Sequence, residues 1–210
     1  MEFDVSAVCA IVEYSSRTAE RQDKLSTRFN HLAEILCEAV TWAKLEGAEL
    51  VTAAHIQKTI YEKEQRMKLY EEKLDEMLEE NVIMIDTEGA EIGQINGLAV
   101  LDMGNYAFGN PSRITATTYV GKSGIVNIEK EARLSGQTHD KGVQIITGFL
   151  GQTYAQNFPL SLSCRVCFEQ NYNGIDGDSA SSTELYCILS SLAELPIRQD
   201  LAVTGSVNQK

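Results

Sequence analysis

The chain has 210 residues, of which 43% are hydrophobic, so it can bury the core of one large domain or of two modest ones. Its formal net charge of −12 and its pI near 4.7 argue against a nucleic-acid partner, because phosphate binding depends on clustered Lys and Arg. No apolar run approaches the roughly 20 residues that span a bilayer and the N-terminus lacks a signal-peptide pattern, so we expect a cytoplasmic protein with no membrane partner.

Residues 1–80 are predicted to be almost entirely helical. A short helix is expected over Ser6–Glu20. Apolar residues then recur at three- and four-residue steps over Leu25–Ala43, which predicts one amphipathic helix. Thr52 can cap a further helix whose apolar positions continue to Met77. The first part of the chain is therefore a small helical unit.

From residue 81 onward the pattern changes to one of frequent glycines and β-branched residues. The clearest strand is Leu160–Phe168, in which apolar residues alternate with other residues at a period of two. The second half is therefore predicted to be α+β. Its other expected strands are 82–86, 92–102, 113–120 and 201–204, and its expected helices are 141–156 and 179–195.

The five cysteines mostly occupy apolar positions, and their odd number indicates reduced thiols in a reducing compartment. Cys164 and Cys167 form one C-x-x-C within the predicted strand. A zinc site would need two further ligands nearby, and a thioredoxin-like site would need the start of a helix. No metal site is expected.

The most informative segment is residues 173–182, Asn-Gly-Ile-Asp-Gly-Asp-Ser-Ala-Ser-Ser. It places Ser179 in the first turn of the predicted helix, where backbone N–H groups lack intrahelical partners and could stabilise an oxyanion. This geometry suits a nucleophile. The same residues also suit a glycine-rich turn followed by a helix N-cap, and the local pattern alone leaves both interpretations open.

A serine nucleophile needs a base, and the chain offers three histidines as candidates. His31 and His55 lie in the helical half, where packing or surface roles are the simpler interpretation. His139 precedes the predicted helix 141–156 and could form a triad with Ser179 and an aspartate. A capping or loop role for His139 fits the sequence equally well.

Taken together, the second half resembles the proteolytic domain of Lon proteases, especially the B-type branch and the Lon homologues. The resemblance covers roughly residues 81–210 and is strongest in 174–182, Gly-Ile-Asp-Gly-Asp-Ser-Ala-Ser-Ser, and in 201–207, Leu-Ala-Val-Thr-Gly-Ser-Val. Supporting matches occur in order along the chain, at 93–98, 109–115, 127–129, 134–136, 139–142 and 168–170.

This resemblance implies a Ser–Lys dyad in which Ser179 attacks the peptide carbonyl and a neutral lysine acts as general base. Thr204 matches the threonine that helps to position that lysine in the family. Asp176 and Asp178 match acidic positions beside the nucleophile, where they could hold the lysine or shape the loop around Ser179.

The chain departs from the family pattern because the dyad lysine, expected beyond the threonine-glycine strand, is absent. Lys122, Lys130 and Lys141 do not match its position, and Lys210 matches a turn, where a hydrated lysine would stay protonated. We therefore expect a C-terminally truncated fragment of a longer protein, with little or no peptidase activity of its own.

The first half resembles the small helical lid of an AAA+ ATPase, which predicts a lid-like domain over 1–80 before the incomplete proteolytic domain over 81–210. Arg28 then matches the sensor arginine that reaches the phosphates of a bound nucleotide, although a plain surface arginine fits equally well. No G-x-x-x-x-G-K-[ST] loop occurs. ATP and Mg²⁺ are implied for the parent protein, and neither is expected to bind this fragment.

The family reading predicts an ATP-dependent serine endopeptidase that cleaves unfolded cytosolic proteins inside a ring, expected to be a hexamer. Two alternatives stay open at this point. One is a non-catalytic assembly or regulatory module that keeps the protease fold. The other is a stand-alone serine hydrolase in which His139 serves as the base.

Overall fold

The computed structural model describes residues 1–104 and 106–209, so Lys210, which the sequence argument rejects as a base, lies outside the described residues. The chain divides into two compact units, Met1–Glu72 and Lys73–Lys210, which are described separately. None of the helices in the described part combines the length and the apolar character needed to cross a lipid bilayer.

The first unit is built from helices α1 (Val5–Thr18), α2 (Phe29–Leu45) and α3 (Ala53–Met67), followed by the start of α4 (Leu69–Glu79). Two short parallel strands, β1 (Glu2–Phe3) and β2 (Leu50–Val51), join its N-terminus to the segment before α3. The three helices share one small core made by Ala7, Ile35, Ala39, Ala43, Val51 and Ile56.

Two of the predicted helices were wrong in extent. The segment 25–28 is not helical, because Ser26 Oγ accepts from the Arg28 N–H and Ser26 N donates to Ser15 Oγ, which gives the backbone partners outside a helix. The long helix after Thr52 is broken at Lys68, whose N–H bonds to the Gln65 carbonyl in a tighter turn. The predicted cap at Thr52 is confirmed.

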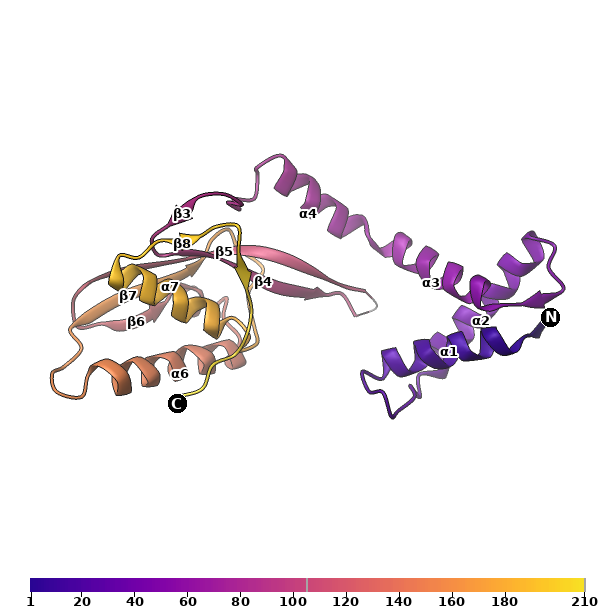
Figure 1. Ribbon diagram of the computed structural model, residues 1–210, viewed down its shortest axis with the longest axis horizontal. Coiled ribbons are helices and arrows are strands. Elements are labelled where there is room, and N and C mark those ends of the chain that lie inside the picture. Colours follow the sequence, from indigo (N-terminus) through magenta and orange to yellow (C-terminus); the bar gives the residue numbers. More distant parts are fainter. Residues whose placement is uncertain (105, 210) are drawn as a thin grey trace. The chain divides into compact units, whose positions relative to one another are not determined.

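The second unit contains a five-stranded mixed sheet in the order β6-β7-β5-β4-β9 (Figure 1). Strands β4 (Gln94–Asp102), β5 (Ala107–Val120) and β7 (Leu162–Phe168) are antiparallel neighbours. Strand β6 (Gly124–Asn127) runs parallel to β7, and β9 (Ala202–Val203) runs parallel to β4. Strands β3 (Ala90–Glu91) and β8 (Ile197–Arg198) form a separate antiparallel pair.

Helix α7 (Ser181–Ala193) packs on β4 and β5, and α6 (Gln137–Tyr154) packs on α7 and β6 (Figure 1). A short helix, α5 (Ile128–Glu131), follows β6. The predicted alternation is confirmed for Leu162, Cys164, Val166 and Phe168, which are buried in one core with Ile146 and Leu150 of α6. It was wrong for Leu160, which is exposed and precedes the strand, and for Ser163, which is buried. The chain is therefore α+β, with a mixed sheet and helices that share its core.

The predicted strand over Val82–Asp86 was wrong. The backbone of this segment is hydrogen-bonded to one side chain and not to a neighbouring strand. The Gln170 side-chain amide accepts from the Met84 N–H and donates to the Val82 carbonyl. Helix α7 also begins two residues later than predicted, at Ser181, so Ser179 lies in the turn before the helix.

Candidate active site

Ser179 lies on an exposed turn that leads into α7. Its side chain is open to solvent, and Ala180 is the N-cap of the helix. Two residues earlier, Gly177 has φ of +91°, a left-handed conformation that glycine adopts without strain. The sharp turn that exposes Ser179 therefore depends on a glycine at this position.

The first-turn amides of α7 are occupied by the protein itself. The Ser181 N–H and the Ser181 hydroxyl both donate to the Asp178 carbonyl, at 3.1 and 2.7 Å, and the Ser182 N–H donates to the Gly205 carbonyl at 2.9 Å. The expectation that the amides at this helix start are free to stabilise an oxyanion was therefore wrong for these two. An oxyanion at Ser179 would need other donors.

Thr204 lies beside Ser179, although 25 residues separate them in sequence. The Gly205 N–H donates to the Ser179 carbonyl at 2.6 Å, and Thr204 Oγ1 lies 3.5 Å from the same oxygen. Thr183 Oγ1 in turn donates to the Val203 carbonyl at 2.9 Å. The segment after β9 is thus bonded directly to the turn that holds Ser179.

Asp176 caps helix α6 from a different part of the chain. Its Oδ1 accepts from the N–H groups of Thr138 and His139 at 3.1 and 3.2 Å, at a helix start where the N-cap residue, Gly136, has no side chain. A bond from the Gly177 N–H, followed by the bond from His139, lowers the pKa of Asp176. These contacts favour the loop-shaping role for Asp176. Asp178 contributes its carbonyl to α7.

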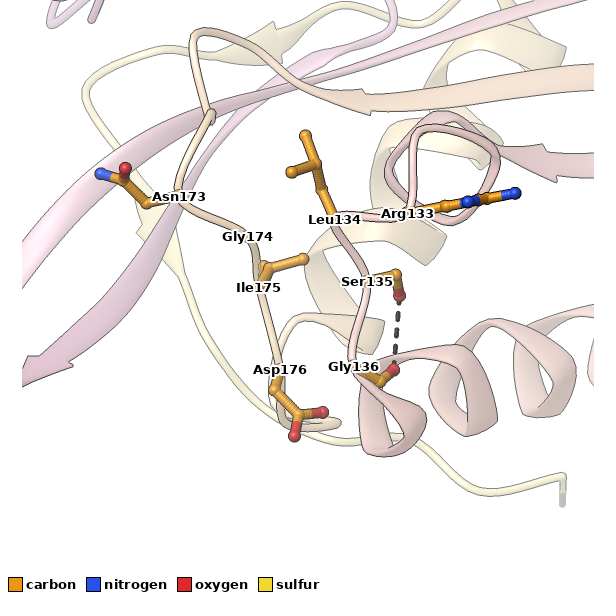
Figure 2. Close-up of a pocket in the computed structure, with 8 residues that line it drawn as sticks. All are labelled: Arg133, Leu134, Ser135, Gly136, Asn173, Gly174, Ile175 and Asp176. Carbon is orange, nitrogen blue, oxygen red and sulfur yellow. Dashed lines mark hydrogen bonds between the residues drawn. The ribbon is translucent and has the colours of Figure 1, made fainter.

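An open pocket of about 440 Å³ lies beside Asp176 (Figure 2). Two segments, 133–136 and 173–176, form it, and a parallel bridge joins Ser135 to Ile175. The Gly136 N–H donates to the Ile175 carbonyl and the Ile175 N–H to the Leu134 carbonyl, both at 2.8 Å. Asp176 ends the lining and is the lining residue that comes closest to Ser179 in the sequence, three residues before it.

His139 is buried and bonded through both ring nitrogens. Nε2 lies 3.0 Å from Glu184 Oε1, and Nδ1 lies 2.9 Å from Ser135 Oγ and 3.3 Å from Asn127 Nδ2. Both ring nitrogens already have partners, so neither is available to accept a proton from Ser179. The alternative of a stand-alone serine hydrolase therefore lacks its proposed base. Sequence reasoning missed Glu184, because its partner His139 lies 45 residues away and no spacing or periodicity marks the pair.

None of the three lysines of the second unit that were considered as bases is buried. Lys122, Lys130 and Lys141 are all exposed, and Lys130 Nζ pairs with Asp140 at 3.4 Å. The described residues also contain no group of three or more His, Cys, Asp or Glu that could hold a metal ion. Arg28 is an exposed N-cap residue of α2, in the first unit.

Comparison with known proteins identifies the family. Residues 2–66 match the family model described as "Archaeal LonB, AAA+ ATPase LID domain". A Haemophilus influenzae protein named "Putative Lon protease homolog" is 32% identical over 216 residues, which cover 100% of this chain and 35% of that protein. The chain belongs to the Lon protease family. The same name applies to an Escherichia coli K12 relative that is 43% identical over 143 residues, or 67% of this chain and 24% of the relative.

An archaeal relative extends the match. The "Archaeal Lon protease" of Archaeoglobus fulgidus is 26% identical over 212 residues, which cover 99% of this chain and 33% of that Lon protein. The chain therefore spans between a quarter and about a third of the length of these Lon relatives.

Proposed function

We propose that this chain is part of a longer, ATP-dependent Lon serine endopeptidase that hydrolyses peptide bonds of unfolded cytosolic proteins. The observation that supports this most is the turn at Ser179, which is exposed and bonded to the segment of Thr204. In this proposal residues 81–210 belong to the proteolytic domain and residues 1–80 to an AAA+ lid.

In the proposed mechanism, Ser179 Oγ attacks the peptide carbonyl and gives its proton to a neutral lysine. The protonated lysine passes that proton to the leaving amine as the peptide C–N bond breaks, and water then hydrolyses the acyl-enzyme. This lysine would come from outside the 210 residues, since Lys122, Lys130 and Lys141, the lysines considered as bases, are all exposed. A lysine positioned by the Thr204 hydroxyl would meet Ser179, because Thr204 Oγ1 already lies 3.5 Å from the Ser179 carbonyl.

The proposed roles of the two aspartates differ. Asp176 fixes the turn by capping α6. One carboxylate oxygen, Oδ1, accepts hydrogen bonds from the N–H groups of both Thr138 and His139. Asp178 fixes the start of α7 through its backbone carbonyl, which leaves its carboxylate as the group that could face the lysine. Asp178 is thus the better candidate for contact with the base.

ATP and Mg²⁺ would act in the longer protein. The exposed guanidinium of Arg28 suits a phosphate oxygen, but the sequence contains no glycine-rich phosphate loop, so the chain by itself does not form a complete nucleotide site. Arg28 would contribute to a site completed by residues outside this chain. We further propose that the longer protein assembles into a ring of six copies, without nucleic acid.

Isothermal titration of this chain with Mg-ATP tests the incomplete nucleotide site. We expect no binding in the micromolar range, for the reason just given. Micromolar affinity that is lost in an Arg28→Ala variant would contradict the proposal that the phosphate-binding residues lie elsewhere.

The alternative of a non-catalytic module is favoured by one observation, which is that the three lysines considered as bases are exposed. The two proposals differ in what the longer protein does, and they agree that the 210-residue chain alone is inactive. An assay of this chain on unstructured casein, beside a Ser179→Ala control, should show no serine-dependent cleavage. Robust cleavage that disappears in the control would show that a base lies within the chain and would overturn the proposed dyad.

A further inference from the structure

Glu184 and His139 form a buried ionisable pair that the proposed chemistry does not use. Each side chain is only 1% exposed, and Glu184 Oε1 lies 3.0 Å from His139 Nε2. The imidazole also meets the ring of Phe168 edge-on, with 5.4 Å between the ring centroids. The pair joins the first turn of α7 to the first turn of α6.

The hydrogen bonds around His139 favour the imidazolium form. The Ser135 hydroxyl donates to Asp140 Oδ1 at 2.7 Å, so its oxygen is free to accept a proton from His139 Nδ1 at 2.9 Å. The Glu184 carboxylate accepts from Nε2 on the other side. With the Ser135 oxygen and the Glu184 carboxylate both accepting, each ring nitrogen carries a proton and His139 is a cation between two carboxylates. Asn127 Nδ2, which can only donate, lies farther from Nδ1, at 3.3 Å, and makes no hydrogen bond to a protonated Nδ1.

Several charges from neighbouring elements act on this cation. Burial lowers the pKa of His139, but the hydrogen bond to Glu184 and the negative charges of Glu184, Glu129 and Asp140 outweigh burial and raise it. Burial raises the pKa of Glu184. The hydrogen bond to His139 lowers this pKa in part, and the negative charge of Glu129 raises it further. The Asp176 carboxylate accepts a hydrogen bond from the His139 backbone N–H, and Cys167 of β7 lies near Glu129.

Loss of the positive charge would leave two buried carboxylates without compensation. Glu129 is 2% exposed and uses Oε1 to accept from the Phe168 N–H at 2.7 Å. In the described part of the chain, Glu129 Oε2 and Glu184 Oε2 are buried without a hydrogen-bond partner. Such groups are costly in a low-dielectric interior, so the arrangement depends on the imidazolium.

The pair is connected to both ends of the turn that contains Ser179. The His139 N–H donates to Asp176 Oδ1, three residues before Ser179, and the Glu184 N–H donates to the Ala180 carbonyl, directly after it. A buried ion pair seldom adds net stability over apolar residues of the same volume, but it can fix one register between two elements. A shift of about 1 Å in a nucleophile can reduce a rate by about 10².

We propose that Glu184 and His139 are positioning residues that fix α6 against α7 and thereby fix the turn around Ser179. The inference rests on the proposed function only in taking Ser179 as the nucleophile.

The test measures the imidazole and three amides in this chain by NMR, for the unmodified protein and for Glu184→Gln. The ¹⁵N shifts of His139 should show both nitrogens protonated at pH 7 in the unmodified chain and a neutral ring in the variant, because burial then acts on the ring without the carboxylate. Amide exchange at His139, Ser182 and Gly205 should become at least tenfold faster in the variant, while amides of β5 and β7 stay protected. His55→Gln, which changes a buried histidine of the first unit, is the matched control and should leave all three amides unchanged.

A pH titration of the unmodified chain gives the same information if the variant fails to fold. After correction for the intrinsic pH dependence of exchange, the three amides should lose protection as the pH rises through the folded pKa of His139. Unchanged protection in both experiments, or a neutral His139 at pH 7 in the unmodified chain, would overturn the proposal. Neither readout needs catalysis, so this failure is distinct from a failure of Ser179 as nucleophile.

Discussion

At the scale of single residues, the close approach of Gly136 to Asp176 shapes the turn beside the proposed nucleophile. A Cβ at position 136 would overlap the Asp176 side chain and come within 2.7 Å of its Cβ. The φ of Gly136 is −79°, which any residue can adopt, so the requirement for glycine comes from this contact alone. The sequence motif could not reveal it, because 40 residues separate the two positions.

Gly136→Ala is expected to displace Asp176 from the start of α6 and to destabilise the second unit by about 1–3 kcal/mol, the usual cost of overpacking. Gly151→Ala is the matched control in the same helix, where an added Cβ meets no atom within 4 Å, and it should stabilise by about 0.5–1 kcal/mol. Urea unfolding followed through the amide resonances of α6 measures both changes. Equal effects from the two substitutions would contradict the contact.

The candidate site was partly predictable from residues alone. The motif around Ser179 and the segment of Thr204 indicated two positions that the fold brings together, through the bonds of Gly205 and Thr204 to the Ser179 carbonyl. The pair of His139 and Glu184 was not predictable, because its partners are 45 residues apart and neither spacing nor periodicity marks them. Long-range side-chain contacts of this kind require the packed structure.

At the scale of elements, periodicity predicted most helices and strands because each buries one face in a core. The errors fall where side chains replace the regular backbone bonds, at Ser26 before α2 and at Gln170 beside residues 82–84. The long helix divides at Lys68, where the sequence has neither a glycine nor a change in the spacing of apolar residues. The sequence pattern alone therefore could not show this break.

Helix α3 offers a test of capping. His55 Nδ1 accepts from the Thr52 N–H at 2.9 Å, which completes a capping box at the start of the helix. We expect His55→Ala to destabilise the first unit by about 1 kcal/mol, whereas His55→Gln should retain most of the stability because glutamine can serve at the same position. Trp42, the single tryptophan, lies in this unit and provides the fluorescence signal for urea unfolding. Equal losses from Ala and Gln would contradict the cap.

The start of α6 is expected to respond to acid. Because its bonds to N–H groups hold the pKa of Asp176 below the ordinary value, the charged carboxylate stabilises this helix start above about pH 4, and the contribution is lost as the pH falls through the folded pKa. In Asp176→Asn this acid dependence should disappear. Amide exchange of Thr138 and His139 between pH 2.5 and 6 measures it, and an identical acid dependence in the variant would contradict the cap.

At the scale of the whole molecule, the chain joins a helical unit that matches an AAA+ lid model to an α+β unit with an exposed serine turn. Lon membership follows from a relative that is 32% identical over 100% of this chain, and the segments matched make up 24–35% of the relatives. We propose that the phosphate-binding loop and the general base are supplied by residues outside these 210. Under this proposal, peptidase activity belongs to the longer protein.

The central claim is that Ser179 is the nucleophile of that protein. The most direct measurement is ATP-dependent cleavage of casein by the longer gene product that contains this chain, compared with its Ser179→Ala variant and with Ser161→Ala as the control at an exposed serine of the second unit. The account predicts that Ser179→Ala lowers kcat by on the order of 10⁶ while Ser161→Ala retains ATP-dependent cleavage. Cleavage by the Ser179→Ala variant at the rate of the unmodified protein would contradict it.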